Sequence, residues 1–301
     1  MRSEGFLERM ASSSAARVAE AKARVNEREL RARALDTRQP PPLELGAEGF
    51  DLIAELKLRS PAAGRLAAPG EGGSVDEVAA RVRDYVHGGA AAVSVLTEPA
   101  RFDGSLEHLE AATRALEGLS PHDAPAARRV PAMRKDFLVD PYQVLEARAA
   151  GAGGVLVILR MLTEGAATAL LDCARELGLF VLLEAFDEAD IERAHAIVES
   201  HGDAAHGPLL VGLNCRDLDT LQVVPGRLEA LAATLPASVP RVAESGVASA
   251  KDAARVAAAG YDLALVGSAL MGARVPAELV RDLLVAGRGA RRDAERRGEE
   301  R

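Results

Sequence analysis

Charged and polar residues follow several short apolar runs of this 301-residue chain. The residues found at these positions are Glu55, Lys57, Lys135, Glu184, Asn214, Arg216 and Glu244. Lysine and carboxylate side chains can donate and accept protons in general acid–base catalysis, and lysine and arginine bind anions. A single charge at such a position is explained equally well by a structural ion pair. Because buried charge is costly unless it is paired or used, its recurrence after five runs predicts an active site.

The first run indicates how these charges would be oriented. Glu55 and Lys57 are two residues apart, so they lie on one face of a strand, whereas Ala54 and Leu56 lie on the other. The apolar face would pack against helices. The charged face would therefore point toward the site.

Two pairs of serine and glycine end the last two runs, as Ser245-Gly246 and Gly267-Ser268. Glycine exposes backbone amides, and such amides can bind a phosphate together with hydroxyl groups and a following helix N-terminus. One such pair is a common turn. Two pairs at consecutive strands predict a phosphate-binding site.

The apolar runs alternate with amphipathic stretches, which predicts parallel strands connected by helices. The predicted strands are 52–56, 91–96, 132–135, 155–159, 180–184, 209–214, 239–244 and 263–267. The runs are largely continuous, as is typical of strands buried on both faces. Eight strand–helix units favour the α/β class and a single (β/α)8 TIM barrel with an extra N-terminal helical segment. A doubly wound sheet is the alternative, but it fits eight evenly spaced units less well.

The domain organisation follows from the composition along the chain. Residues 1–48 are expected to form an N-terminal helical extension packed on the barrel, since an Ala-, Arg- and Glu-rich stretch precedes the breaker Gln39-Pro40-Pro41-Pro42. Residues 49–287 would form the barrel, with helix starts marked by Ser74 and Ser249. Residues 288–301 mix Arg and Glu densely and are expected to be a frayed or disordered tail.

Composition also restricts partners and location. The net charge of −8, from 37 basic and 45 acidic residues, argues against nucleic acid or an anionic membrane as the main partner. No apolar run is long enough to span a bilayer, and the N-terminus lacks a signal pattern. Cys173 and Cys215 match no metal or redox spacing. We therefore expect a cytoplasmic protein that acts on a small phosphorylated molecule, and the sequence is compatible with a monomer.

Several segments together resemble the indole-3-glycerol-phosphate synthase family, in order and over nearly the whole chain. The matching segments are Ile53-Ala54-Glu55-Leu56-Lys57 with Ser60-Pro61, Ser94-Val95-Leu96-Thr97-Glu98 with Phe102-Asp103-Gly104-Ser105, Arg134-Lys135-Asp136-Phe137 with Asp140-Pro141-Tyr142-Gln143, Gly212-Leu213-Asn214-Cys215-Arg216-Asp217-Leu218, Ala243-Glu244-Ser245-Gly246 and Gly267-Ser268-Ala269-Leu270-Met271. The resemblance implies a carboxy-lyase of tryptophan biosynthesis. Its substrate would be 1-(o-carboxyphenylamino)-1-deoxyribulose 5-phosphate, and its products indole-3-glycerol phosphate, CO₂ and water. No metal or organic cofactor is implied.

The resemblance also implies roles for the charged residues. Lys135 would protonate the ribulose carbonyl oxygen during ring closure, and Lys57 would pair with the carboxylate that leaves as CO₂. Glu55 and Glu184 would move protons during dehydration, and which of them is acid and which is base stays open. Asn214 would also take part in catalysis. Together with Arg216 and Glu244, it would orient the sugar chain and the other charged groups.

The remaining site residues would bind the two ends of the substrate. The phosphate would be held by Ser60, Ser245, Gly246, Gly267 and Ser268. The aryl ring would lie against Phe102, Phe137, Leu156 and Leu221, although core packing explains these four equally well. The family usually has Ser-Pro-Ser in the first loop, and this chain has Ser60-Pro61-Ala62.

The sequence leaves two other functions to compare with this one. A related phosphate-binding barrel such as phosphoribosylanthranilate isomerase would need a cysteine near the end of the first strand, where this chain has Glu55 and Lys57. A non-catalytic paralogue that binds phosphorylated ligands would be expected to lose its proton-transfer residues. Those residues are present, so the sequence favours the enzyme.

Overall fold

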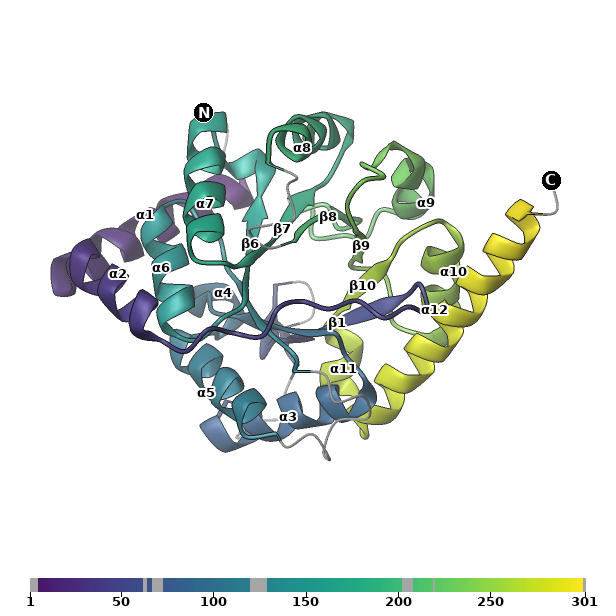
Figure 1. Cartoon of the computed structure of the whole chain (residues 1–301), viewed down its shortest axis with the longest axis horizontal. Coiled ribbons are helices and arrows are strands. Elements are labelled where there is room, and N and C mark those ends of the chain that lie inside the picture. Colours follow the sequence, from purple (N-terminus) through teal and green to yellow (C-terminus); the bar gives the residue numbers. More distant parts are fainter. Residues whose placement is uncertain are drawn as a thin grey trace.

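The computed structural model describes residues 5–61, 64–66, 73–119, 129–201, 208–218 and 220–299. Ala62, which distinguishes the first loop from the usual family pattern, lies outside the described residues. The chain folds around a closed barrel of parallel strands, in the order β1, β10, β9, β8, β7, β6, β5 and β4 (Figure 1). The predicted (β/α)8 barrel is therefore confirmed.

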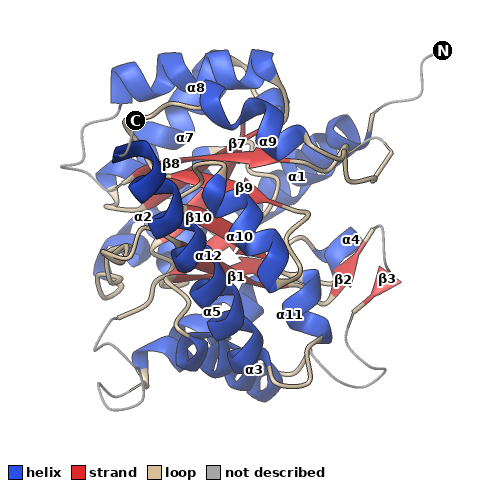
Figure 2. Cartoon of the chain, turned by 90° about the vertical axis from the view of Figure 1, so that its right-hand side faces the viewer, coloured by secondary structure: helices blue, strands red, loops and turns tan. Residues whose placement is uncertain are grey.

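The barrel strands agree with the predicted ones to within two residues at each end. Their bounds are β1 (Asp51–Leu56), β4 (Ala92–Leu96), β5 (Ala132–Lys135), β6 (Gly154–Ile158), β7 (Phe180–Ala185), β8 (Leu209–Asn214), β9 (Arg241–Glu244) and β10 (Leu263–Val266). A separate hairpin pairs β2 (Arg59–Ser60) with β3 (Gly64–Arg65). Figure 2 shows this hairpin beside helix α4 (Pro99–Phe102), beyond one end of the barrel.

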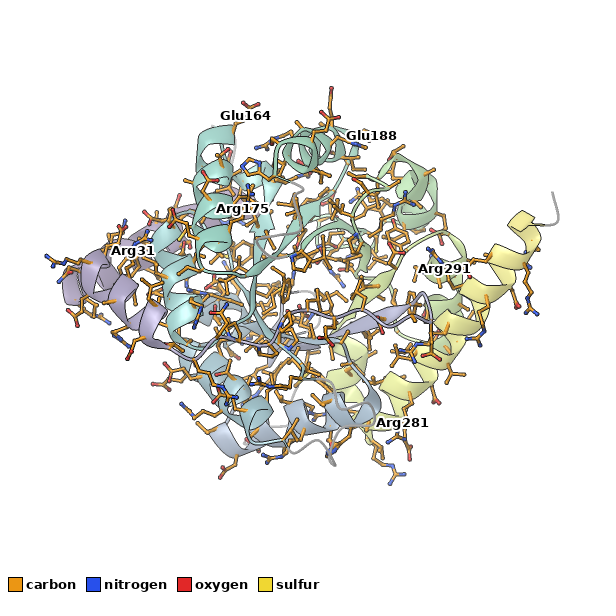
Figure 3. The ribbon with its side chains drawn as sticks, in the orientation of Figure 1. Arg31, Glu164, Arg175, Glu188, Arg281 and Arg291 are labelled. Atoms are coloured by element: carbon orange, nitrogen blue, oxygen red, sulfur yellow. The ribbon has the colours of Figure 1, made fainter. Side chains whose placement is uncertain are left out.

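Helices surround the barrel, and their outer faces carry charged side chains such as Arg31, Glu188 and Arg281 (Figure 3). The longer ones are α3 (Val75–Gly88), α5 (Leu106–Glu117), α6 (Pro141–Ala149), α7 (Glu164–Glu176), α8 (Glu188–His201), α10 (Ala250–Ala258) and α12 (Pro276–Glu299). The short ones are α9 (Arg227–Leu231), α11 (Ser268–Gly272) and the 3₁₀ turns η1 (Leu159–Met161) and η3 (Ala232–Thr234). The predicted helix starts at Ser74 and Ser249 are confirmed, because each hydroxyl accepts a hydrogen bond from the backbone three residues later.

Successive side chains of each strand belong to two different cores. Ala54 and Leu56 pack in the layer between strands and helices, whereas Ile53 packs inside the barrel. Phe180 also fills the interior, where a Cβ at Gly154 would lie 2.3 Å from its ring. The interior beneath the strand ends is thus packed with apolar side chains, and this packing fixes the positions of the strands.

Helices α1 (Phe6–Arg24) and α2 (Glu27–Asp36) precede the barrel and lie beside α6 (Figure 1). Tyr142 of α6 donates its hydroxyl to the carbonyls of Ala21 and Val25, at 3.1 and 2.8 Å. Lys22 of α1 forms an ion pair of 2.8 Å with Asp140, the N-cap of α6. The N-terminal segment is therefore attached to the barrel by polar contacts as well as by packing.

Residues 288–299 differ from the frayed or disordered tail expected from the sequence, because they continue α12 to Glu299. Arg288 donates to the carbonyl of Phe50 at 3.0 Å and pairs with Asp51 at 3.0 Å. Arg291 pairs with Asp262 at 3.1 Å. These arginines have partners at the start of β1 and before β10, which local sequence pattern does not reveal. Among the described residues, no helix is long and apolar enough to cross a membrane.

Candidate active site

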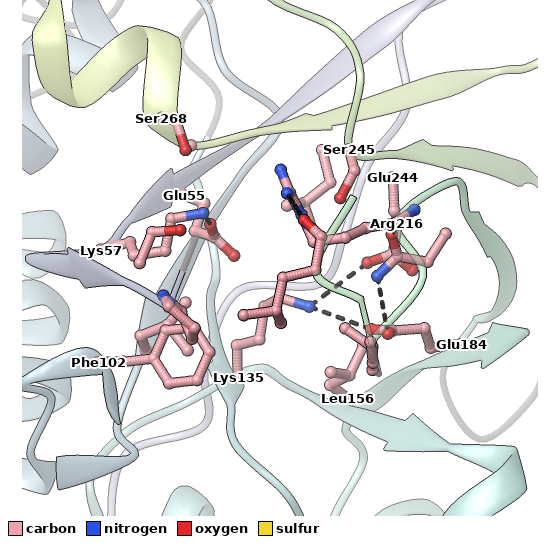
Figure 4. Close-up of a pocket in the computed structure, with 18 of the residues that line it drawn as sticks. Glu55, Lys57, Phe102, Lys135, Leu156, Glu184, Arg216, Glu244, Ser245 and Ser268 are labelled. Atoms are coloured by element: carbon pink, nitrogen blue, oxygen red, sulfur yellow. Dashed lines mark hydrogen bonds and ion pairs between the residues drawn. The ribbon is translucent and has the colours of Figure 1, made fainter. Parts of the chain in front are cut away.

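A pocket of about 300 Å³ lies at the C-terminal ends of the barrel strands (Figure 4). Every site residue predicted from the sequence lines it: Glu55, Lys57, Ser60, Phe102, Lys135, Phe137, Leu156, Glu184, Asn214, Arg216, Leu221, Glu244, Ser245, Gly246, Gly267 and Ser268. This is the end at which (β/α)8 enzymes place their active sites. The structure brings the predicted residues together, and what each does in catalysis stays a prediction.

Lys135 lies at the centre of a group of buried polar side chains (Figure 4). Its Nζ is 3.1 Å from Oε2 of Glu184 and 3.4 Å from Oε2 of Glu244. Asn214 donates from Nδ2 to Oε1 of Glu184 at 3.0 Å. These residues lie at or within one residue of the ends of strands β5, β7, β8 and β9. Barrel closure therefore brings together side chains that are distant in the sequence.

The electrostatics of this group keep Lys135 cationic. Burial alone would lower the pKa of Lys135, but three nearby carboxylates, those of Glu184, Glu244 and Glu55, outweigh burial and raise it. Burial and the charge of Glu184 raise the pKa of Glu244 well above its ordinary value, against the opposing effect of Lys135. The group therefore holds both a proton donor and groups that can accept a proton, as acid–base chemistry requires.

Two glycines make room for the carboxylates of the site. A Cβ at Gly212 of β8 would lie 2.1 Å from Oε1 of Glu244, and a Cβ at Gly267 would lie 2.3 Å from Oε1 of Glu55. Oε1 of Glu244 is buried without a hydrogen-bond partner among the described residues. Because buried polar atoms are rarely left without partners, this oxygen is suited to receive a hydrogen bond from a bound ligand.

A second lysine–glutamate pair comes from a single strand end. Lys57 lies 2.7 Å from Oε1 of Glu55, and their side chains are 15% and 3% exposed. Both point into the pocket, while Leu56 between them packs toward the helices, as the strand alternation predicts. The pocket thus holds two separate pairs of a buried carboxylate and an ammonium group.

The serine–glycine turn after β9 has an unusual backbone. Ser245 has φ of 64° and Gly246 has φ of 70°. The left-handed conformation is unfavourable for serine, and such strain concentrates at functional sites. A Cβ at Gly246 would also lie 2.8 Å from Sγ of Cys215. The turn is therefore held in a conformation that depends on glycine, and it faces the pocket together with Ser268 at the start of α11.

Arg216 is positioned by the loop after β8. Its backbone nitrogen donates to Oδ1 of Asn214 at 2.9 Å, and its Nη1 donates to the carbonyl of Leu221 at 2.7 Å. Leu221 has φ of 60°, again in the left-handed region. The loop is thus folded back so that the guanidinium group and the leucine both line the pocket.

The apolar wall includes side chains that the sequence analysis missed. The ring of Phe137 lies 5.9 Å from that of Phe6 and 6.1 Å from that of Phe102. Also absent from the prediction are Leu96, Ile158, Leu218, Val223 and Leu265. Phe6 could not be predicted from the local sequence pattern, because its contact with Phe137 joins the N-terminal helix to the segment that follows β5. Leu96, Ile158 and Leu265 belong to apolar strands, where nothing in the sequence separates them from core residues. Leu218 and Val223 lie in the loop after β8, and only the fold of that loop brings them to the pocket.

The carboxylate of Asp136, which directly follows Lys135, is an anion at ordinary pH. Burial alone would raise the pKa of Asp136, but hydrogen bonds from Arg17 and the charge of Arg134 lower it to about 2. The side chain of Asp136 has no exposed surface. Its lowered pKa makes the folded state more stable at any pH above the ordinary value of 3.8.

We expect this contribution to be lost as the pH falls from about 4 to about 2, at a cost on the order of 2 kcal/mol. Urea denaturation of the protein and of Asp136→Asn at several pH values measures it. In that interval the free energy of unfolding of the variant should fall less steeply with decreasing pH. Equal slopes for the two proteins would contradict the assignment.

Among the described residues, no group of three or more histidine, cysteine, aspartate and glutamate side chains is arranged to hold a metal ion.

Two solved structures share the fold. Thiamine phosphate pyrophosphorylase from Pyrococcus furiosus is 17% identical with a TM-score of 0.53, covering 81% of this chain and 98% of its own. 3-Hexulose-6-phosphate synthase from Salmonella typhimurium is 15% identical with a TM-score of 0.55, and the match covers 81% of this chain and 99% of that structure.

Similarity in sequence identifies the family, whereas these two structures show the fold alone. Indole-3-glycerol phosphate synthase from Mycobacterium ulcerans is 39% identical over 252 residues, which cover 82% of this chain and 83% of the relative. Indole-3-glycerol phosphate synthase 1 from Streptomyces coelicolor is 39% identical over 272 residues, 90% of this chain and 91% of the relative. Residues 7–283 match the family model described as Indole-3-glycerol phosphate synthase. The chain belongs to the indole-3-glycerol phosphate synthase family.

Proposed function

We propose that this protein converts 1-(o-carboxyphenylamino)-1-deoxyribulose 5-phosphate to indole-3-glycerol phosphate, CO₂ and water. The observation that carries the proposal is the position of Lys135, a buried cation in contact with two carboxylates inside a pocket with an apolar wall. Family membership supports the same reaction. The isomerase and the non-catalytic paralogue are not favoured by it.

Ring closure needs an acid at the ribulose carbonyl. The aromatic carbon that bears the carboxylate attacks the carbonyl carbon, and the carbonyl oxygen takes a proton from Nζ of Lys135. The aryl ring would lie against Phe102, Phe137 and Leu156, which line the pocket beside this lysine. Lys57 would pair with the carboxylate until it leaves as CO₂ and the ring becomes aromatic again.

Dehydration completes the indole. The new hydroxyl leaves as water after it receives a proton, and the five-membered ring loses a proton to a base. Glu184 and Glu55 each lie in contact with a lysine, so both are placed to exchange protons with an acid partner. Glu244 and Asn214 hold Lys135 and Glu184 in place, and Arg216 would orient the glyceryl chain.

The phosphate would bind where Ser60, Ser245, Gly246, Gly267 and Ser268 line the pocket. We expect Ser268→Ala to raise the KM about 10-fold with little change in kcat, because a hydrogen bond to an anion is lost while the reacting atoms are unaffected. Steady-state kinetics measure this. With a substrate that lacks the phosphate, the variant and the unchanged protein should behave alike, and an unchanged KM for the phosphorylated substrate would contradict the assignment.

We also propose a cytoplasmic monomer. Cys173 and Cys215 are both free thiols, as is usual in a reducing compartment. A monomer would have a mass near 31.5 kDa, which light scattering measures directly.

The test of the proposed function is to supply the carboxyphenylamino-deoxyribulose phosphate to the purified protein and identify the product by indole fluorescence and mass. We expect indole-3-glycerol phosphate. Folded protein that forms none would overturn the proposal.

A further inference from the structure

The exit of strand β5 is held by helix α1 through one buried carboxylate. Oδ1 and Oδ2 of Asp136 accept hydrogen bonds from both terminal nitrogens of Arg17, at 2.8 and 3.0 Å. Thr97 donates to the same carboxylate at 2.8 Å, and Arg134 donates at 3.1 Å. The two-pronged geometry of an arginine–carboxylate pair fixes orientation as well as distance.

The residue after Asp136 is held from the same side. The backbone nitrogen of Phe137 donates to Oδ1 of Asp136 at 2.8 Å, and its carbonyl accepts a hydrogen bond from the hydroxyl of Ser14 in α1. Gln143 of α6 donates to that hydroxyl at 2.9 Å. Helix α1 therefore fixes both residues that follow Lys135.

Within the part of the chain that the structure describes, Lys135 forms its ion pairs with Glu184 and Glu244, on other barrel strands, and none with α1. Any effect of α1 on Lys135 must pass through the backbone at the exit of β5. The side chains alternate there: Arg134 and Asp136 bond to each other and to α1 or α6, and Lys135 points into the pocket. The backbone from 134 to 136 is thus fixed from outside the barrel, while the side chain of Lys135 points into the pocket.

We propose that Asp136 and Arg17 are positioning residues, whose buried ion pair fixes the exit of β5 and thereby aims Lys135 at the reacting carbonyl. The proposal rests on the proposed function, in which Lys135 is the acid. The side chain of Asp136 has no exposed surface, and Arg17 is not among the residues that line the pocket. Because a displacement of about 1 Å at an acid can cost up to about 10²-fold in rate, a small movement of the backbone is sufficient.

A neighbouring ion pair provides a matched control. Lys22 and Asp140 join the same helix α1 to the same segment, at 2.8 Å, but their side chains are 37% and 31% exposed. Asp140 lies four residues beyond Asp136, at the start of α6 rather than at the strand exit. Loss of this pair removes a contact between the same two elements without releasing the backbone next to Lys135.

The experiment compares Arg17→Lys, Arg17→Gln and Lys22→Gln by kcat, KM, urea denaturation and the ¹⁵N NMR signal of the Lys135 ammonium group. Arg17→Lys keeps the charge but loses the two-pronged geometry, so it keeps the proposal testable even where Arg17→Gln fails to fold. We expect kcat to fall about 10- to 100-fold in folded Arg17 variants, with KM within about 3-fold, and Lys135 to change its chemical shift. Lys22→Gln should stay within about 2-fold in kcat with an unchanged Lys135 signal.

An unchanged kcat and an unchanged Lys135 signal in folded Arg17→Lys would overturn the positioning role, as would an equal loss of kcat in Lys22→Gln. The two proposals fail separately. If the unchanged protein forms no indole product, the proposed function fails, while a shifted Lys135 signal in Arg17→Lys would still support the positioning by α1.

Discussion

Lys135→Ala is expected to lower kcat by about 10²–10⁴-fold, with the protein still folded. The ammonium group contacts Glu184 and Glu244, and it is the acid that we place at the ribulose carbonyl oxygen. Ring closure would then depend on water as the acid. Indole fluorescence under saturating substrate measures kcat, and urea denaturation checks the fold.

Chemical rescue separates loss of the acid from loss of structure. Ethylamine or a similar small amine can occupy the space that the truncated side chain leaves, and it should restore part of the activity in proportion to its protonated fraction. A variant with the kcat of the unchanged protein would refute the role of Lys135. A loss of activity that tracks a loss of folded protein would refute it equally, because the effect would then be structural.

Glu184→Gln is expected to lower kcat by about 10²–10⁴-fold as well, for a different reason. The amide keeps the size of the side chain and can keep a hydrogen bond with Asn214, but it cannot accept a proton as the carboxylate does. It also removes one of the charges that raise the pKa of Lys135. Proton transfer from or to this position should therefore fail while substrate binding is retained.

Glu55→Gln is the matched comparison, because Glu55 is a second buried carboxylate paired with a lysine. If both glutamates move protons, each variant should lose kcat with a small change in KM, and the reaction intermediate that accumulates should differ between them. Rapid quenching followed by mass spectrometry identifies the intermediate. Normal turnover in Glu184→Gln would contradict the proton-transfer role of that residue.

The barrel and its site could be predicted from the sequence because two simple rules apply to them. Strands buried on both faces form continuous apolar runs, and a polar residue at the end of such a run is costly unless it serves a site. Glu184 and Asn214 illustrate this, since each lies within one residue of the end of a wholly buried strand and the two meet inside the pocket. Each was predicted as a site residue from its place in the sequence, whereas the hydrogen bond between them is seen only in the structure.

What could not be predicted depends on contacts between distant parts of the chain. Arg17 is one of three arginines in the Ala-rich helix α1, and only the fold places it against Asp136. Arg288 likewise looks like part of a charged tail until Asp51 provides its partner. In both cases the residue type is ordinary for a solvent-exposed helix, and the stabilising partner lies more than a hundred residues away in the sequence. Local pattern carries no signal for such pairs.

In the proposed reaction, this pocket closes the indole ring and releases the carboxylate of the same substrate molecule. The most direct measurement follows a substrate whose carboxyl carbon is labelled, recording labelled CO₂ and indole fluorescence from the same sample. We expect equal amounts of CO₂ and indole-3-glycerol phosphate, and both should fall together in Lys135→Ala. Labelled CO₂ without an indole product, or neither product from the folded protein, would contradict it.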